Sequence, residues 1–378
     1  MRQRKSQLAT LKLSEVTNNG ESSRFESRAL YILRDFTLNV CSNEITSRFL
    51  RYDPKRVFEK YALDTRLLPD KLPLQRSQIQ VDIDYLYLFG SSKVVDHLDP
   101  PLALRLVLYG AKPMALISGP ENLMVSLRQW AIARGLQGIL SPYKYLPVSD
   151  KYKGGYVNLT REGIFEGDRT EIYRSLLISR DEDRLICGWL SLYFGWHRFL
   201  GLLLGYPDCC TQVFEKNWDR AVSAHNGDPT WITLENSRFP PFDWRLNVIA
   251  RYFSFQIIDH FPCHFRCKES VMIAQKYMSF LNAYEPEYAS SLKVTLSHPI
   301  LYTENNGVFI FPEARVIQSG DYQYLHYNPQ SVIMTSFTQL SRSITCSSHI
   351  VSWAGKPEFY VAKQTYAGFL CWFGDLKS

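Results

Sequence analysis

Apolar residues in the first half of the chain switch between the spacing of strands and that of helices. Val81–Phe89 alternates polar with apolar residues and then turns fully apolar, which is typical of a strand that enters a core. The apolar half of Tyr109–Ser118 predicts a second strand, and Glu121–Arg134 has helical spacing that stops at Gly135. Because Gly138–Leu140 begins a further apolar run, the pattern predicts a β-α-β unit.

The second half of the chain changes from helical to β-prone spacing. Lys151–Gly155 and the Gly-, Asp- and Arg-rich residues up to Thr170 predict a surface loop, and Glu171–Leu204 is mostly helical in pattern. After Pro286 the chain contains short β-prone runs separated by Gly, Pro and Asn, which predict a C-terminal sheet. These runs are Val308–Phe311, Ala314–Gln318, Tyr322–Tyr327 and Val332–Ser336.

The patterns together predict an α/β (α+β) protein made of successive regions. We expect residues 1–30 to be a disordered leader rich in Ser, Asn, Arg and Glu, and residues 31–155 to be an N-terminal α/β region. Residues 156–290 are expected to be a helical region that carries the cysteine motifs described below. Residues 291–378 are expected to be a small C-terminal β-rich region.

The most apolar stretch, Leu185–Gly205, is long enough to span a bilayer, but we expect it to lie inside a soluble domain. His197 and Arg198 would lie just past its middle, and an arginine there costs at least about 2.5 kcal/mol. A buried helix accounts for the run at lower cost. Met1–Lys5 is followed by polar residues, not by the apolar run of a signal peptide. We therefore expect no membrane partner and a cytoplasmic location, where cysteines are more often reduced or metal-bound than paired.

The composition narrows the class of protein and its partners. Of the 378 residues, 46% are hydrophobic and 21% are charged, which excludes a long disordered chain, a coiled coil and a collagen-like fibre. The net charge is +6, and residues 1–30 carry half of this excess. The rest of the chain is less basic than a phosphate-binding surface normally requires. We therefore expect a small-molecule substrate and no nucleic acid partner.

Two cysteine motifs carry the strongest chemical signal in the sequence. They are Gly205-Tyr-Pro-Asp-Cys209-Cys210 and His260-Phe-Pro-Cys263-His-Phe-Arg-Cys267, and they hold half of the 8 cysteines. Apolar residues at helical spacing follow each motif, so each cysteine pair is predicted to lie in a Pro-containing turn that opens a helix. The positive end of a helix dipole favours thiolate. Two such ends that converge predict a metal centre held by Cys209, Cys210, Cys263 and Cys267.

The spacing leaves two kinds of metal centre open. Four thiolates can hold either a structural zinc ion or an iron–sulfur cluster. The C-x3-C spacing fits zinc, but we expect adjacent side chains such as Cys209 and Cys210 to diverge, which a cluster with several irons tolerates better. The sequence therefore favours an iron–sulfur cluster, with zinc as the alternative. His260 can replace a thiolate as a ligand in either case.

Other roles for these residues compete with metal binding. The cysteines can be buried apolar residues, or they can form a redox disulfide between the two motifs. His260 is a candidate catalytic residue as a proton carrier, and Asp208 is a candidate because it can orient a ligand or take a proton. A simpler interpretation is that Asp208 caps the helix that follows it.

The paired motifs resemble those of an archaeal and bacterial family catalogued only as a domain of unknown function. The likeness rests on Leu204-Gly-Tyr-Pro-Asp-Cys-Cys210 with His260-Phe-Pro-Cys263-x3-Cys267, and it covers roughly Asp181–Met278. The resemblance implies that the cysteines act as one functional unit. It implies no reaction.

Two hypotheses of function follow from the sequence. The first is a metal-dependent enzyme, with an iron–sulfur cluster favoured, that performs redox or lyase-like chemistry on a small polar metabolite. The second is a non-catalytic protein in which zinc staples two helices and the surface binds a protein or RNA partner.

Overall fold

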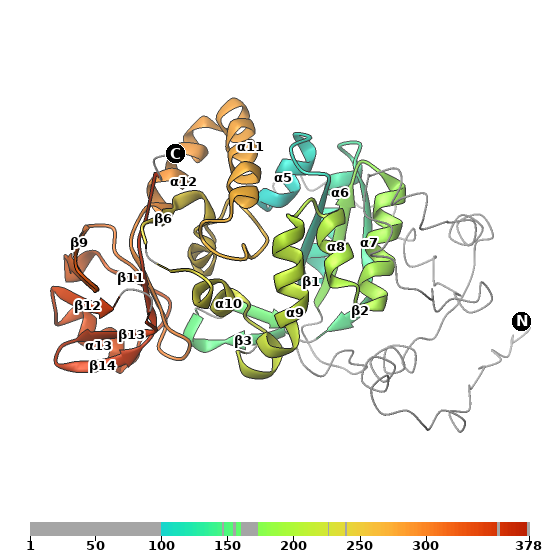
Figure 1. Ribbon diagram of the computed structural model, residues 1–378. Coiled ribbons are helices and arrows are strands. Elements are labelled where there is room, and N and C mark those ends of the chain that lie inside the picture. Colours follow the sequence, from blue (N-terminus) through green and yellow to red (C-terminus); the bar gives the residue numbers. More distant parts are fainter. Residues whose placement is uncertain are drawn as a thin grey trace, which may run out of the picture. The chain divides into compact units, whose positions relative to one another are not determined.

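The computed structural model describes residues 100–145, 147–153, 156–159, 173–225, 227–238, 240–353 and 356–375. All of them belong to one of the two compact units of the chain, Thr37–Ser378. The expected leader and the strand expected at Val81–Phe89 lie outside the described residues. The described part is a mixed α/β structure with a helical middle and a β-rich C-terminal region, as the sequence predicts (Figure 1).

The N-terminal part contains a three-stranded sheet in which the predicted β-α-β unit is split. Strand β1 (Met114–Pro120), helix α6 (Glu121–Ile132) and strand β2 (Gln137–Tyr145) follow one another in the chain. Strand β5 (Tyr173–Ser179) lies between β1 and β2 and is antiparallel to both, so β1 and β2 run parallel without touching. The predicted β-α-β unit is therefore present, and its two strands are parallel as predicted. The sequence did not predict that β5 lies between them.

Strand β5 corrects the expectation that Glu171–Leu204 is mostly helical. Leu176, Leu177 and Ile178 are fully buried. Leu177 packs with helices α7 (Glu182–Phe194) and α8 (His197–Leu203), whereas Leu176 and Ile178 pack on the other face with α6. A strand covered on both faces does not alternate apolar and polar residues, so its spacing cannot be distinguished from that of a short buried helix.

The apolar stretch Leu185–Gly205 folds into two helices where we expected one. Gly195 adopts a left-handed conformation with φ of 69° and ends α7, and α8 begins two residues later. A left-handed residue at this position is a common helix stop, and glycine adopts it without steric cost. In the part of the chain that the structure describes, no helix is long and apolar enough to cross a membrane.

The middle of the chain is helical and contributes most residues of the largest apolar core. The helices predicted after both cysteine motifs are present as α9 (Asp208–Ala224) and α11 (Lys268–Tyr284). Helix α12 begins at Pro286 and runs across position 290, where we expected a regional boundary. The other elements here are α5 (Leu102–Leu108), which precedes β1, α10 (Thr230–Glu235), α12 (Pro286–Leu296) and the 3-10 helices η3 (Trp244–Leu246) and η4 (Val248–Phe253).

The C-terminal region contains the predicted strands, in two antiparallel sheets. A four-stranded sheet has the order β11 (Ile333–Met334), β8 (Val308–Ile310), β7 (Ile300–Tyr302) and β15 (Phe369–Cys371). A five-stranded sheet has the order β14 (Gln364–Ala367), β13 (Glu358–Val361), β12 (His349–Trp353), β10 (Tyr322–Tyr327) and β9 (Ala314–Ser319). The remaining elements are η5 (Pro329–Ser331), α13 (Gln339–Thr345) and the parallel pair β6 (Phe242–Asp243) and β16 (Phe373–Gly374).

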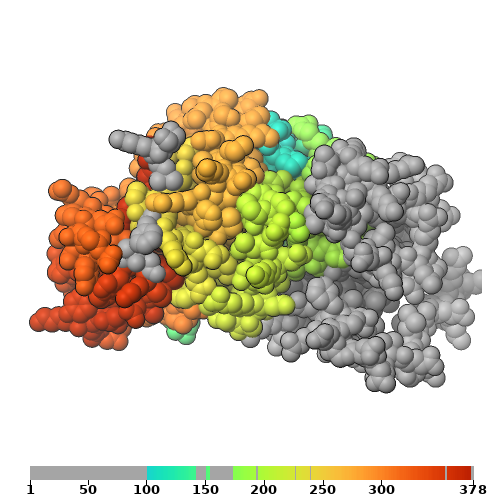
Figure 2. Space-filling view, in the orientation of Figure 1, coloured from blue at the N-terminus to red at the C-terminus, as the bar shows by residue number. Residues whose placement is uncertain are grey.

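The prediction of a surface loop from Lys151 onward is wrong for the first residues of that segment. Strands β3 (Pro147–Asp150) and β4 (Tyr156–Leu159) pair, and the 3-10 helix η2 (Lys151–Lys153) lies between them. Only 1% of Lys153 is exposed. Its buried ammonium is paired with the carboxylate of Asp228 at 2.9 Å. Local composition gives no sign of a partner so distant in the sequence. Figure 2 shows the surfaces of the α8–α9 segment in yellow-green and of α11 and α12 in orange.

Candidate metal centre

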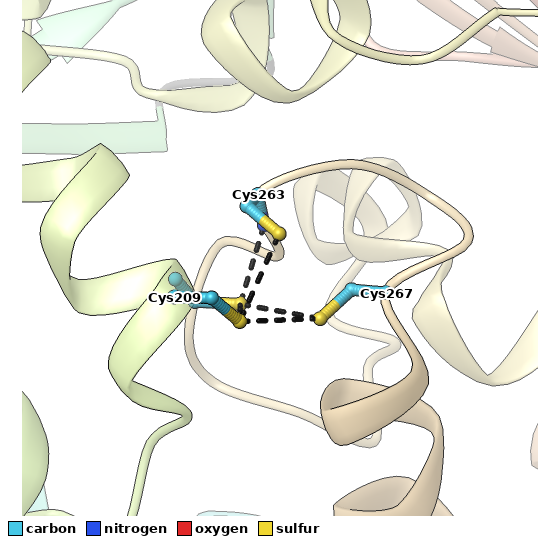
Figure 3. Close-up of side chains that lie close together, drawn as sticks. Cys209, Cys263 and Cys267 are labelled. Atoms are coloured by element: carbon cyan, nitrogen blue, oxygen red, sulfur yellow. Dashed lines mark hydrogen bonds between the residues drawn. The ribbon is translucent and has the colours of Figure 1, made fainter.

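The four cysteines of the two motifs converge on one point. Their Sγ atoms all lie within 4.8 Å of one another. Cys209 Sγ is 3.8 Å from Cys210 Sγ and 3.6 Å from Cys267 Sγ, and Cys210 Sγ is 3.7 Å from Cys267 Sγ. Cys263 Sγ lies 4.0 Å from Cys209 Sγ (Figure 3). Within the described ranges, no second group of three or more His, Cys, Asp or Glu side chains is gathered in this way.

Local sequence places each cysteine pair in or directly before the first turn of a helix, as predicted. Pro207 is the residue before α9, so Cys209 and Cys210 lie in the first turn of that helix. Cys267 is the N-cap residue of α11, and Cys263 lies in the turn that leads to it. The expectation that adjacent cysteines diverge is wrong here, since both sulfurs of the Cys209–Cys210 pair reach the same centre.

The centre lies at the edge of the main core. Cys210 and Cys267 are buried, with 2% exposure each, while Cys209 and Cys263 are half-buried. The backbone N–H of Cys263 donates to Cys210 Sγ over 3.3 Å. A sulfur that accepts a backbone hydrogen bond is favoured as thiolate. The centre is therefore enclosed on the Cys210 side and open to solvent on the opposite side.

The four thiols shift one another's pKa because they lie close together. Burial, together with the Cys267 thiol, raises the pKa of Cys209 to about 12. Hydrogen bonds from Cys210 and Cys263 lower the pKa of Cys267 well below its usual range, while the pKa of Cys210 is raised by Cys263 and Cys267. These shifts have opposite signs because the thiols share hydrogen bonds. A cation among the sulfurs would allow more of them to ionise.

Ser270 connects the cysteines to His260. Its Oγ lies 3.2 Å from Cys210 Sγ and 2.9 Å from His260 Nε2, and both side chains are buried. Burial lowers the pKa of His260 to about 4, so the imidazole is neutral at pH 7. A neutral imidazole can donate through Nε2 to the serine hydroxyl, which can then donate to Cys210 Sγ. The gathered ligand atoms are the four sulfurs alone, and His260 lies behind them.

Asp208 makes contacts on the surface rather than with the cysteines. Its carboxylate accepts two hydrogen bonds of 2.9 Å from Arg198 and one of 2.7 Å from Gln212. The interpretation of Asp208 as a helix cap is wrong, because Pro207 holds the N-cap position and Asp208 lies in the first turn. Its carboxylate still lies near the positive end of the helix, where negative charge is favourable.

The sequence analysis did not identify three residues near the cysteine centre, namely Ser270, Glu269 and Lys112. Ser270 and Glu269 follow Cys267, and Glu269 Oε2 lies 3.4 Å from Cys267 Sγ. Ser270 could have been found, because a residue three positions after Cys267 lies on the same face of a helix. Lys112, described below, gives no such signal because it is far away in the chain.

The chain was also compared with known proteins. No family model, curated protein or solved structure matches it. The resemblance noted above therefore rests on its motifs, and the structure supports one part of it, namely that the paired motifs form a single four-cysteine cluster able to hold a metal.

Proposed function

We propose that Cys209, Cys210, Cys263 and Cys267 bind one zinc ion in a closed structural site, and that the chain is a zinc-stapled, non-catalytic binding protein. The observation that carries this proposal is the spacing of the sulfurs. Tetrahedral zinc with Zn–S bonds of about 2.3 Å requires sulfurs about 3.8 Å apart. The closest sulfur pairs lie 3.6 to 4.0 Å apart.

The same spacing weighs against an iron–sulfur cluster. In a cluster, thiolates on different irons are separated by the irons and by inorganic sulfide. Four sulfurs within 4.8 Å of one another leave too little room for that arrangement. The sequence-based preference for a cluster relied on the divergence of Cys209 and Cys210, which the geometry does not support.

A closed site also weighs against chemistry at the metal. Catalytic zinc keeps a position open for water or substrate, whereas structural zinc has four protein ligands. Four cysteine ligands around one ion would leave no such position open. The ion would join the first turn of α9 to the turn before α11, and the positive ends of both helices would face its negative ligand set. The zinc ion would stabilise the fold, and the protein would bind its partner through another surface.

Metal and sulfide content of the full chain, purified without oxygen, tests the proposal. We expect one zinc per chain, no acid-labile sulfide, and visible thiolate-to-metal absorption after replacement of zinc by Co²⁺. Cys267→Ser should lose the metal. Cys346→Ser is the matched control, since Cys346 is an exposed cysteine outside both motifs, and it should keep the metal.

Two results would overturn the proposal in different directions. Iron with acid-labile sulfide would restore the cluster and the metalloenzyme hypothesis. Absence of metal, with cysteines that react with an alkylating agent only after reduction, would instead identify a redox disulfide.

A further inference from the structure

The buried ammonium of Lys112 contacts the first cysteine motif and the residue that directly precedes the second. Lys112 lies in the turn between α5 and β1, and 1% of its side chain is exposed. Its Nζ donates to the carbonyl oxygen of Leu204 over 3.1 Å and to Asp259 Oδ1 over 2.9 Å. It also lies 4.5 Å from the centre of the Tyr206 ring. Tyr206 belongs to the first motif, and Leu204 and Asp259 directly precede the first and the second motif.

Lys112 also connects the motifs to the N-terminal sheet. The next residue, Pro113, leads into β1, and its carbonyl accepts a hydrogen bond of 2.8 Å from Ser179 at the end of β5. Gly205 packs against the other side of Pro113, where a Cβ atom would lie 2.9 Å from the proline ring. Because Gly205 also has φ of 81°, a side chain there would be both strained and obstructed.

We infer that Lys112 is a positioning residue for the cysteine centre and that it links metal binding to the order of the N-terminal sheet. The inference rests on the proposed metal site. Leu204 lies five residues before Cys209, and Asp259 lies four residues before Cys263. The ammonium therefore fixes the distance between the two chain segments that bring in the ligands. A metal site requires its ligands to be held within about 0.5 Å, so this distance affects affinity.

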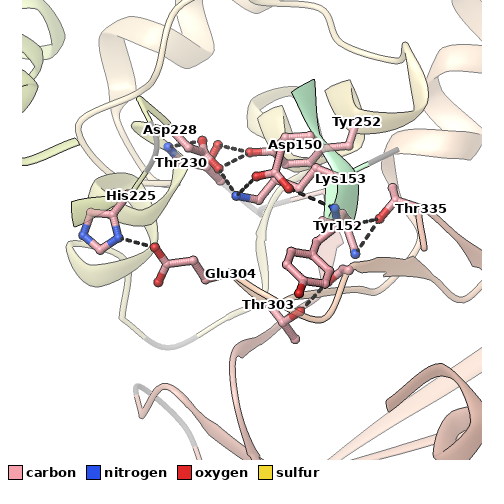
Figure 4. A network of polar contacts seen from close by, with 12 residues as sticks. Asp150, Tyr152, Lys153, His225, Asp228, Thr230, Tyr252, Thr303, Glu304 and Thr335 are labelled. Atoms are coloured by element: carbon pink, nitrogen blue, oxygen red, sulfur yellow. Dashed lines mark hydrogen bonds and ion pairs between the residues drawn. The ribbon is translucent and has the colours of Figure 1, made fainter. Parts of the chain in front are cut away.

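Lys153 offers a matched control for a test. It is also 1% exposed and also lies 2.9 Å from an aspartate, but its partner is Asp228 (Figure 4). Its other carboxylate neighbour is Asp150, at 3.3 Å. Lys112→Met and Lys153→Met therefore remove the same charge from equally buried positions, and only the first position contacts the motifs.

The experiment measures Zn²⁺ affinity of the full chain by competition with a chromophoric chelator, per folded molecule. Lys112→Met should weaken affinity by about ten- to a hundred-fold, the usual effect of removing an outer partner of a metal site. Lys153→Met should leave it unchanged. Hydrogen exchange adds a second readout, since zinc should slow exchange in Met114–Pro120 of the unaltered chain and of Lys153→Met but not of Lys112→Met. If Lys112→Met fails to fold, Asp259→Asn replaces it, with the same direction expected.

The outcomes separate this inference from the proposed function. Wild-type affinity and zinc-dependent protection in Lys112→Met would overturn the positioning role while leaving the zinc site intact. Equal weakening by both lysine variants would also overturn it, because the effect would then be general destabilisation. If the unaltered chain binds no metal, the zinc site itself is wrong and the inference falls with it.

Discussion

Two buried polar centres lie at junctions between distant parts of the chain, and they differ in how their charge is balanced. In the first, the carboxylate of Asp228 lies 2.9 Å from the ammonium of Lys153 and accepts hydrogen bonds from Tyr252 and Tyr302 (Figure 4). Arg251 lies 3.8 Å away, and Asp150 faces Lys153. Positive and negative groups of the chain itself surround one another.

The cysteine centre has no such balance. Its four sulfurs face one another, and the nearest carboxylate, that of Glu269, adds negative charge. The nearby ammonium of Lys112 is directed to Leu204 and Asp259, not to the sulfurs. The comparison teaches that burial alone does not reveal a role. Buried charges that the chain itself balances stabilise the fold, whereas a cluster of four cysteine sulfurs is the donor set of a possible metal site.

The largest expected effect comes from breaking the balanced centre. Asp228→Ala should lower the free energy of unfolding by about 3–5 kcal/mol, because it removes the buried carboxylate that contacts both Lys153 and Arg251. Chemical denaturation of the full chain measures this loss. Zinc content per folded molecule should stay at the wild-type value. A variant as stable as the unaltered chain would contradict the view that this network stabilises the fold.

The pH dependence of stability follows from the same aspartate. Burial alone would raise the pKa of Asp228, but Lys153 and Arg251 hold it well below its usual range. The unfolded chain then binds the proton more readily than the folded chain, so the stabilisation is fully present above the unfolded pKa of about 3.9 and declines as the pH falls below it. Denaturation between pH 3 and pH 7 should show this acid-side loss in the unaltered chain and not in Asp228→Ala.

Removal of zinc should have the next largest effect. With free zinc about a hundredfold above its Kd, binding stabilises the fold by about 2.7 kcal/mol, which a strong chelator should abolish. Thermal unfolding with and without chelator measures the shift. The cysteine variant Cys267→Ser should be insensitive to the chelator. A chelator effect of equal size in that variant would show that the stabilising ion lies elsewhere.

Loss of the Ser270 hydroxyl should weaken metal binding without unfolding the protein. Ser270→Ala removes the hydroxyl that lies between Cys210 Sγ and His260 Nε2, and we expect zinc affinity to fall about ten-fold or more. Titration with Co²⁺ should also shift the thiolate absorption band. Ser279→Ala is the control on the same helix, because Ser279 is exposed and bonds only to the Lys276 carbonyl oxygen. Unchanged affinity in Ser270→Ala would remove this residue from the site.

The smallest expected effect comes from two glycine variants, which distinguish backbone strain from a steric clash. Gly195 and Gly205 both have positive φ, and alanine at either should cost about 1–2 kcal/mol. Only Gly205 has Pro113 against it, whereas nothing lies within 4 Å of a Cβ at Gly195. Gly205→Ala should therefore also lower zinc affinity, and Gly195→Ala should not. Equal metal affinities would mean that the Pro113 contact does not influence the centre.

The sequence predicts the parts of this molecule that depend on short-range patterns. The helices after Cys210 and Cys267 and the C-terminal strands follow from local spacing. The cysteine cluster follows from two short motifs, although Cys210 and Cys263 lie 53 positions apart in the chain. Strand β5 does not, because its burial on both faces removes the alternation by which a strand is recognised. The positions of Lys112 and Lys153 depend on partners more than seventy residues away, which no local pattern encodes.

The strand order of the N-terminal sheet has a consequence for synthesis of the chain on the ribosome. The middle strand, β5, is made after both of its neighbours, so in the described part β1 and β2 have no ladder partner until residue 179 has emerged. During that interval two apolar strands expose unpaired edges, a state prone to association with other nascent chains. A chain shortened before Tyr173 would keep those edges permanently. Chaperone demand during translation should therefore be highest before β5 is complete.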